Sequence, residues 1–173
     1  MRKLIALACL AGLAASAAAD LGIYSATLTG AEEVPPVVTS ASAASSFSFD
    51  TVTGILRGSI SANGFSSEVF GARIHTGAFG SNGPITIDLG APTAIGSGFI
   101  WDMNFEFHGN IGPDSLSNDE LKALLDSGGM YINIFTLAKE TGEIRGQIHP
   151  VPEPASLVTL GWGGLLLARR RKR

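Results

Sequence analysis

Phe99-Ile-Trp-Asp-Met-Asn-Phe-Glu-Phe107 is the stretch of this chain that decides its fold class. Apolar side chains occupy every second position of it, at 99, 101, 103, 105 and 107, and four of the five are aromatic. Successive side chains of a β-strand point to opposite faces, so these five share one face while Asp102, Asn104 and Glu106 share the other. The stretch predicts a strand with one face in a hydrophobic core.

Other segments on both sides have the length and composition of strands, and Gly-, Pro- and Asn-rich connections separate them. They span residues 23–30, 43–50, 55–62, 69–76, 84–89, 130–136 and 143–148. Val52-Thr-Gly54 between the second and third predicts a hairpin. Short strands in this number predict a mainly β fold, an antiparallel β-sandwich of the immunoglobulin-like or a related kind.

One short helix is expected near residues 117–127. Ser117-Asn-Asp-Glu120 has the form of a capping box, and Leu121, Leu124 and Leu125 follow at helical spacing. Gly128-Gly129 would end the helix. We expect its leucines to cover one open end of the sandwich.

The N-terminus has the pattern of a secretory signal peptide. Arg2 and Lys3 precede the apolar segment Leu4–Leu13, and Ala17-Ala-Ala19 offers a cleavage site before Asp20. The sequence therefore predicts a signal peptide over residues 1–19 and a single folded domain over residues 20–150.

The C-terminus, residues 151–173, has three parts in a fixed order. Val151-Pro-Glu-Pro154 is followed by an apolar run over 155–168 and by Arg169-Arg-Arg-Lys-Arg173. The run would be a helix of roughly 21 Å against roughly 30 Å of hydrocarbon, so it predicts a weak, transient inner-membrane anchor. The terminal cations would stay in the cytoplasm, which leaves the domain on the far side of the membrane.

This order of parts resembles the PEP-CTERM sorting signal of Gram-negative bacteria. The resemblance implies export through the secretion machinery, cleavage by a membrane-embedded exosortase, and delivery to the cell surface or the exopolysaccharide around it. The sorting residues that it implies are Pro152, Glu153, Pro154, Arg169, Arg170 and Arg171.

Charge and cysteine content exclude several classes of partner. Residues 20–154 contain five basic and fifteen acidic residues, a net charge of −10, so nucleic acid is not an expected partner. Cys9 would leave with the signal peptide, so the domain would have neither a disulfide nor a thiolate metal site. Excess acid attracts divalent cations, but the chain has no Asp-x-Asp-x-Asp loop, so calcium binding would be diffuse and weak.

Four motifs in the middle of the chain resemble the CHRD domain, in the order of that family. They are Ala26-Thr-Leu-Thr-Gly-Ala-Glu-Glu-Val-Pro-Pro36, Gly71-Ala-Arg-Ile-His-Thr-Gly-Ala-Phe-Gly-Ser-Asn-Gly-Pro84, Tyr131-Ile-Asn-Ile-Phe-Thr136 and Gly142-Glu-Ile-Arg-Gly-Gln147. The family takes its name from chordin, an animal inhibitor of bone morphogenetic proteins, and also occurs in secreted microbial proteins. The resemblance implies a fold and an exported location, and no activity.

Each motif allows a structural and a binding interpretation. Glu33-Val-Pro-Pro36 either ends a strand and protects a sheet edge or contacts a ligand. The loop 77–83, which contains Asn82, either makes a tight turn or brings its backbone close to a ligand. Glu143 and Arg145 share one face of a strand, so they form an ion pair across the sheet or a recognition site. The candidate binding residues are His75, Asn82, Asn133, Glu143 and Arg145.

His75 is the centre of the enzymatic hypothesis. In the CHRD family the segment matching Arg73-Ile-His75 often reads His-x-His, and the one matching Asn133-Ile-Phe-Thr136 often has a third histidine. Arg73 and Phe135 replace two of these three imidazoles here. The chain also lacks a G-x-S-x-G nucleophile elbow. We therefore expect no catalytic residue, no metal and no cofactor. We expect His75 to be a structural residue held by hydrogen bonds.

Three hypotheses about function follow. The first is an exported, non-catalytic cell-envelope or extracellular-matrix protein that is sorted through its C-terminal signal. The second is a surface module that binds a glycan, such as exopolysaccharide, or a surface protein through the loop 77–83 and the strand with Glu143 and Arg145. The third is a metal-dependent enzyme centred on His75.

Overall fold

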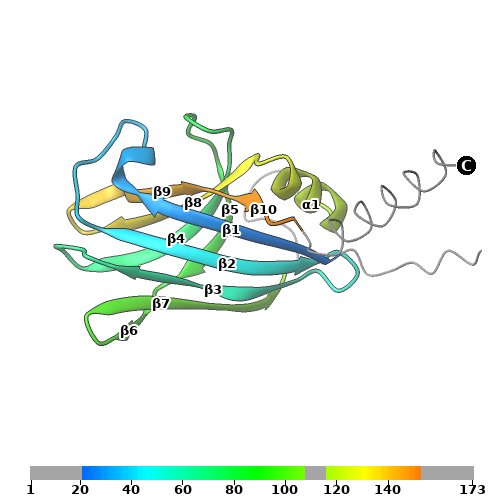
Figure 1. The fold of residues 1–173 in the computed structure, drawn as a ribbon, viewed down its shortest axis with the longest axis horizontal. Coiled ribbons are helices and arrows are strands. Elements are labelled where there is room, and N and C mark those ends of the chain that lie inside the picture. The colour runs from blue at the N-terminus through cyan, green and yellow to red at the C-terminus, as the bar shows by residue number, and fades with distance from the viewer. Residues whose placement is uncertain (1–20, 108–115, 153–173) are drawn as a thin grey trace, which may run out of the picture.

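The computed structural model describes residues 21–107 and 116–152, which form ten β-strands, one α-helix and one 3-10 helix (Figure 1). In chain order the elements are β1 (Leu21–Thr29), η1 (Gly30–Glu32), β2 (Ser42–Asp50), β3 (Ile55–Asn63), β4 (Val69–Thr76), β5 (Ile85–Gly90), β6 (Thr93–Ile95), β7 (Gly98–Glu106), α1 (Asn118–Asp126), β8 (Met130–Thr136), β9 (Lys139–Gln147) and β10 (His149–Pro150). The mainly β fold with one short helix is confirmed.

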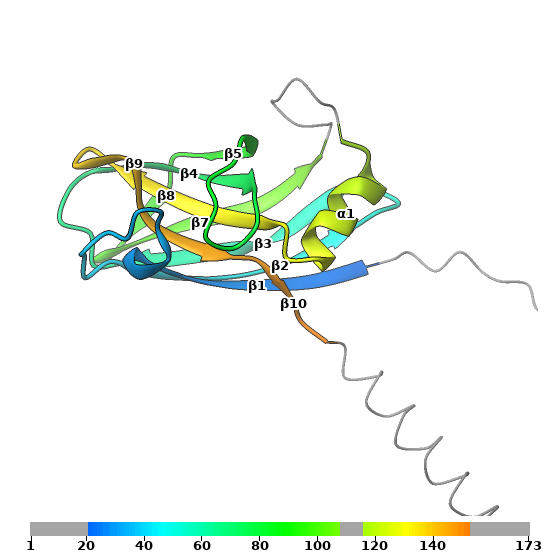
Figure 2. The same cartoon turned by 90° about the horizontal axis from the view of Figure 1, so that it is seen from above.

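All strands belong to one antiparallel sheet with the order β5-β4-β8-β9-β1-β2-β3-β7-β6, and β10 pairs with β1. The sheet curls, so that its two halves enclose one hydrophobic core (Figures 1 and 2). The expected sandwich is therefore present, but its two layers are joined along β9 and β1 and are not separate sheets.

The joint between the layers depends on a glycine. β1 and β9 pair only at Thr29 and Arg145, and the first part of β1 pairs with β10 instead. A Cβ atom at Gly146 would lie 2.5 Å from the carbonyl oxygen of Thr27. Real Cβ atoms do not approach an oxygen so closely, so only glycine lets β9 pass this near to β1.

The opposite side of the curled sheet is open, and one side-chain hydrogen bond spans it. The indole Nε1–H of Trp101 in β7 donates to the carbonyl oxygen of Gly90 at the end of β5, at 2.9 Å. Trp101 is buried, and a buried indole N–H needs such a partner. The bond therefore connects the edge strand β5 to β7, which lies next to the other edge strand, β6.

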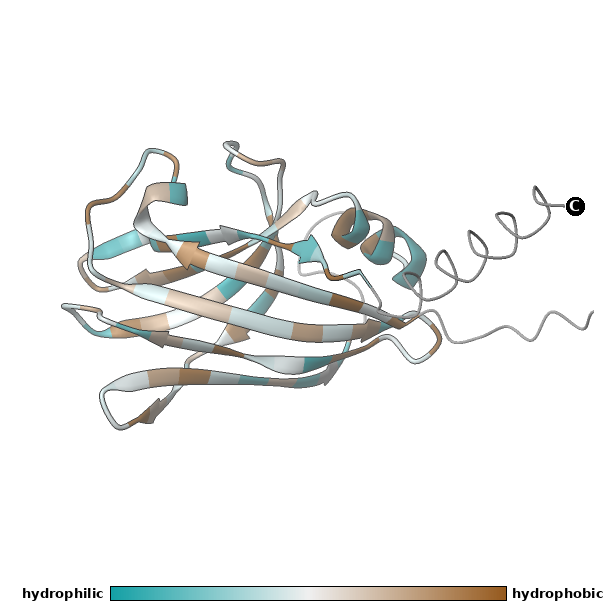
Figure 3. Ribbon diagram, in the orientation of Figure 1, coloured by the Kyte–Doolittle hydropathy of each residue, from teal (hydrophilic) through white to brown (hydrophobic). Residues whose placement is uncertain are grey.

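The alternation of β7 predicted its faces correctly. Trp101 and Met103 are buried while Asp102 and Asn104 are exposed, and Phe107 just beyond the strand is also buried. Buried and more exposed residues also alternate along β2, and Figure 3 shows apolar and polar residues interspersed along the strands. The same core contains buried residues of every long strand and of the helix, among them Leu28, Phe49, Leu56, Ile60, Ile74, Ile132, Ile144 and Leu121.

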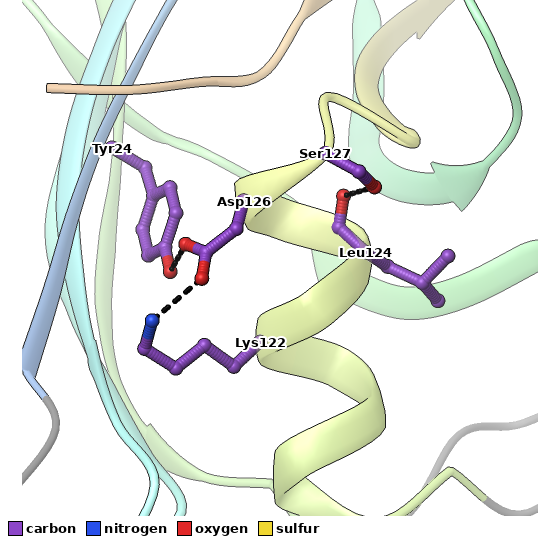
Figure 4. A network of polar contacts seen from close by, with 5 residues as sticks. All are labelled: Tyr24, Lys122, Leu124, Asp126 and Ser127. Carbon is purple, nitrogen blue, oxygen red and sulfur yellow. Dashed lines mark hydrogen bonds and ion pairs between the residues drawn. The ribbon is translucent and has the colours of Figure 1, made fainter.

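Helix α1 begins and packs as its sequence predicts. The hydroxyl of Ser117 accepts from the backbone N–H of Glu120, whose side chain bonds back to Ser117, which completes the capping box. Leu121 and Leu125 are fully buried. At the other end of the helix, Tyr24 of β1 donates to Asp126 at 2.8 Å, and Lys122 pairs with the same carboxylate (Figure 4). The helix is thus bonded directly to the first strand.

The sequence did not predict every element. β9 begins at Lys139, four residues before the expected strand, and β6, β10 and η1 were not expected. Lys139-Glu-Thr-Gly142 has the composition of a turn, but pairing of Thr136 with Lys139 draws it into the β8–β9 hairpin. Local composition is a weak guide where a neighbouring strand supplies the hydrogen bonds.

The predicted signal peptide (1–19), membrane anchor (155–168) and basic end (169–173) lie outside the described residues. Within the described residues, no helix has the length and apolarity needed to cross a membrane.

Candidate functional site

Three neighbouring strands place polar side chains on the face of the sheet that is turned away from the main core. His75 of β4 lies opposite Tyr131 of β8, which lies opposite Gln147 of β9. Two residues further along, Asn133 lies opposite Arg145. Paired residues share a face, as do residues two apart in a strand, so these five side chains form one cluster.

Two loops cover this cluster. The Val34 loop (residues 30–41) follows β1, the Phe79 loop (residues 77–84) follows β4, and both project from the same side of the sheet (Figure 1). The Asn82 amide Nδ2 donates to the carbonyl oxygen of Val34 at 2.8 Å, which joins the loops. Glu33 of the Val34 loop and the strand residues beneath the loops, Asn133, Glu143, Arg145 and Gln147, are exposed by 6 % or less.

Arg145 is the centre of the cluster and is 1 % exposed. Its guanidinium lies over the Tyr131 ring, with the central carbon 3.5 Å from the ring centroid. Its nitrogens donate to the side chain of Asn82 at 3.3 Å, the carbonyl of Ala78 at 3.1 Å and the side chain of Gln147 at 3.2 Å. A planar guanidinium suits this combination of stacking and several hydrogen bonds, and it holds the Phe79 loop against β9.

His75 stacks on the Tyr131 ring, with the ring centroids 4.9 Å apart and the planes 10° apart. Its Nδ1 lies 3.0 Å from the carbonyl oxygen of Gly83, and since a carbonyl only accepts, Nδ1 carries the proton. Burial lowers the pKa of His75, the bond to Gly83 opposes this shift, and the charges of Arg73 and Arg145 add to it. The neutral imidazole is therefore favoured, and it acts as a donor that fixes the loop.

Glu143 has different partners from Arg145, although both residues face the same way. One carboxylate oxygen accepts from the hydroxyl of Thr39 and the other from the hydroxyl of Thr136, both at 2.6 Å. Short O–H···O⁻ bonds of this kind are stronger than bonds between neutral groups. Glu143 thus holds the Val34 loop, through Thr39, to the hairpin of β8 and β9.

Glu33 and Asn133 meet above Gly142. Glu33 Oε1 and Asn133 Oδ1 are buried and have no hydrogen-bond partner in the part of the chain that the structure describes. A Cβ atom at Gly142 would lie 2.6 Å from both oxygens, so glycine leaves the space that they share. Burial raises the pKa of Glu33 to about 7, although the charge of Arg145 and the Val34 N–H act in the opposite direction. Because both of these neighbouring oxygens are acceptors, a proton on the Glu33 carboxyl is favoured.

Gln147 connects a third segment to the cluster. Its Nε2 donates to the carbonyl oxygens of Gly77 at 2.9 Å and Gly128 at 2.6 Å. Its backbone N–H donates to the carboxylate of Glu32 at 3.2 Å. One residue therefore ties the Phe79 loop, the segment after α1 and η1 to the end of β9.

A scan against protein-family models matches residues 24–148 with the CHRD domain. The chain belongs to the CHRD domain family. The matched region contains β2 to β9, most of β1 and the whole of the buried cluster. Searches of curated proteins and of solved structures find no match.

The cluster of this CHRD domain has the chemistry of an internal support. Most of its donors and acceptors are paired with the two loops, and the loops cover them. In the described ranges, 21–107 and 116–152, no group of three or more His, Cys, Asp or Glu side chains is placed to hold a metal ion. A ligand reaches Arg145, Glu143 or Asn133 only if a loop moves away.

The CHRD domain places all five candidate binding residues on or under the two loops. Asn82 lies in the Phe79 loop, which is bonded to His75 and Arg145. Glu143 is bonded to Thr39 of the Val34 loop, and Asn133 lies close to Glu33 of that loop. Sequence reasoning missed the roles of Tyr131, Gln147 and the two threonines. The spacing of Tyr131 and Asn133 could have indicated the role of Tyr131, because residues two apart in a strand lie on the same face. No local signal linked Thr39 to Glu143, which lies 104 positions away.

Proposed function

We propose that this protein is an exported, non-catalytic component of the cell envelope or the extracellular matrix, sorted by an exosortase through residues 151–173. The observation that carries the proposal is the order of Pro152-Glu-Pro154, a short apolar run and a basic end. After release, the β domain would reside at the cell surface or in the exopolysaccharide.

The limits of the domain are compatible with two removable ends. β1 begins at Leu21, the second residue after the expected signal-peptide cleavage site. At the other end, the backbone N–H of Val151 donates to the carbonyl oxygen of Ile23 at 2.8 Å, and the sorting motif begins at the next residue. Cleavage in or after that motif would remove none of the described strands.

The buried cluster supports a non-catalytic role. A catalytic group must reach its substrate, whereas Glu143 and Arg145 are 2 % and 1 % exposed and bonded within the domain. His75 also uses Nδ1 to hold Gly83. The arrangement fits a protein whose loops are held rigid for contact with something outside.

The sorting proposal is tested in the native host with Glu153→Ala, and Glu140→Ala is the matched control. Glu140 is an exposed acid at the start of β9. We expect the wild type and Glu140→Ala to reach the envelope or the medium with the mass of a chain shortened at both ends. Glu153→Ala is expected to fold normally and to stay in the inner membrane with its C-terminus uncut. A normal mature mass for Glu153→Ala would refute the proposal.

The second candidate function is a glycan- or protein-binding surface module, and one observation favours it. The exposed Phe79 lies at the tip of a loop whose flanks are bonded to the buried cluster. The third, a metal-dependent enzyme centred on His75, would have to recruit Nε2 of a single imidazole, which is a poor site for a metal ion.

A further inference from the structure

Phe79 is a large apolar side chain in an unusual place. It is 72 % exposed, whereas Phe47, Phe49 and Phe107 lie in the core and Phe65 and Phe99 pack against it. The next residue, Gly80, has φ +75° and no atom within 4 Å of a Cβ built on it, so the loop turns sharply in open space. The ring therefore projects from the domain with solvent around it.

The backbone on both sides of Phe79 is held in place. On the N-terminal side, the Gly77 N–H donates to the carbonyl of Gly129 at 2.8 Å, and the carbonyl of Ala78 accepts from Arg145. On the C-terminal side, the Gly83 N–H donates to the Tyr131 hydroxyl at 3.1 Å. An exposed aromatic ring on a rigid loop loses little conformational entropy when it binds, which favours a role in recognition.

The neighbouring Val34 loop extends this surface. Val34 is bonded to Asn82, and Pro35, Pro36 and the fully exposed Val38 follow it. Together, residues 34–41 and 77–84 contain no charged residue, on a chain whose residues 20–154 carry a net charge of −10. Long-range repulsion acts against a polyanion, and nothing at this surface offers a charge to pair with one. An uncharged partner fits it best.

We propose that the tips of these two loops bind an uncharged polysaccharide, with the Phe79 ring stacked on the C–H face of a sugar ring. The exposed Ser81 beside it and the backbone of the loop supply hydrogen-bonding groups for sugar hydroxyls. This inference rests on the second candidate function and names its ligand and its contact residue. Arg145, His75 and Tyr131 act through the loop and do not touch the sugar.

The test is co-sedimentation of the full chain, kept soluble in detergent, with exopolysaccharide of the native host separated into neutral and anionic fractions. Phe79→Ala is compared with Phe70→Ala, which removes another exposed phenylalanine from β4, outside both loops. We expect saturable binding of the wild type to the neutral fraction, with little dependence on salt. Phe79→Ala should weaken binding about tenfold, while Phe79→Trp and Phe70→Ala should retain it.

Equal binding by Phe79→Ala and the wild type would overturn the proposal, as would binding to the anionic fraction alone or no binding to any fraction. The absence of binding to any fraction would indicate that this surface binds a protein instead. Circular dichroism and urea unfolding of Phe79→Ala verify that the fold is intact. Processing at Glu153 is a separate readout, so failure of this inference and failure of the sorting proposal are distinguishable.

Discussion

The guanidinium of Arg145 lies 3.5 Å above the Tyr131 ring, in contact with a ring that also stacks on His75. These residues come from three adjacent strands, β9, β8 and β4. Arg145, His75 and the Tyr131 hydroxyl each bond to the Phe79 loop. A buried cation is costly unless it is well bonded, so the arginine and the loop stabilise each other.

Arg145→Ala should destabilise the domain strongly. It removes three hydrogen bonds and the contact with Tyr131, and leaves the Ala78 carbonyl without that donor. We expect the free energy of unfolding in urea to fall by about 3 kcal/mol. The matched control is Arg57→Ala, because Arg57 is exposed and its side chain donates a hydrogen bond to Asn104 at 3.2 Å. This variant should lower the free energy of unfolding by about 0.5 kcal/mol. Equal costs for the two variants would contradict a supporting role for Arg145.

Glu33 should make stability depend on pH. Its pKa is about 7 in the folded domain and 4.5 as the ordinary value, so the folded state binds the proton more tightly. Protonated Glu33 contributes fully to the free energy of unfolding below about pH 4.5. This contribution, at most about 3 kcal/mol, is lost as pH rises through about 7. Glu33→Gln should remove this slope, because glutamine does not ionise.

The measurement is urea unfolding of wild type and Glu33→Gln between pH 4 and 8, compared as a difference at each pH. The pKa of His75 is lowered, so its contribution has the opposite sign and is lost as pH falls below its ordinary 6.5. It cancels in the difference, because both proteins contain His75. A difference that does not change with pH would mean that folding leaves the pKa of Glu33 unchanged, which would contradict the prediction.

The alternation of apolar and polar residues predicted most of the fold, because the side chains of a half-buried strand point in turn to the core and to solvent. The strand at residues 99–107 and the capping box at Ser117 are examples. The joint between the layers was not predictable, because nothing in the sequence distinguishes Gly146 from other glycines. Its role depends on the carbonyl oxygen of Thr27, which lies 2.5 Å from where a Cβ atom would be.

The sequence named residues that the structure places near one another, but it did not predict the groups to which they bond. The shared face of one strand identified Glu143 and Arg145, and Asn133 was a candidate within a motif that resembles the CHRD domain. The sequence did not reveal that the backbone of Gln147 bonds to Glu32, 115 positions away. Such contacts depend on how two loops fold over the sheet. Sequence periodicity carries no information about that arrangement.

Gly146→Ala should weaken the joint between the layers. The added methyl group would overlap the carbonyl of Thr27 and lie 2.9 Å from Leu28 Cγ, so β9 and β1 must separate. We expect a loss of about 3 kcal/mol in thermal or urea unfolding. Gly80→Ala controls for backbone strain alone, since Gly80 has φ +75° and open space around it, and should cost about 1 kcal/mol. A Gly146→Ala domain as stable as the wild type would show that the strands separate freely.

The claim that the buried cluster holds the Phe79 loop rigid is tested most directly by amide hydrogen exchange of Gly83, read by NMR. Gly83 lies in a surface loop, and its N–H donates to the Tyr131 hydroxyl at 3.1 Å. We predict exchange about 100-fold slower than in an unprotected peptide, and loss of that protection in Tyr131→Phe. Exchange of Gly83 at the unprotected rate in the wild type would mean that the loop is not held, and would contradict the account.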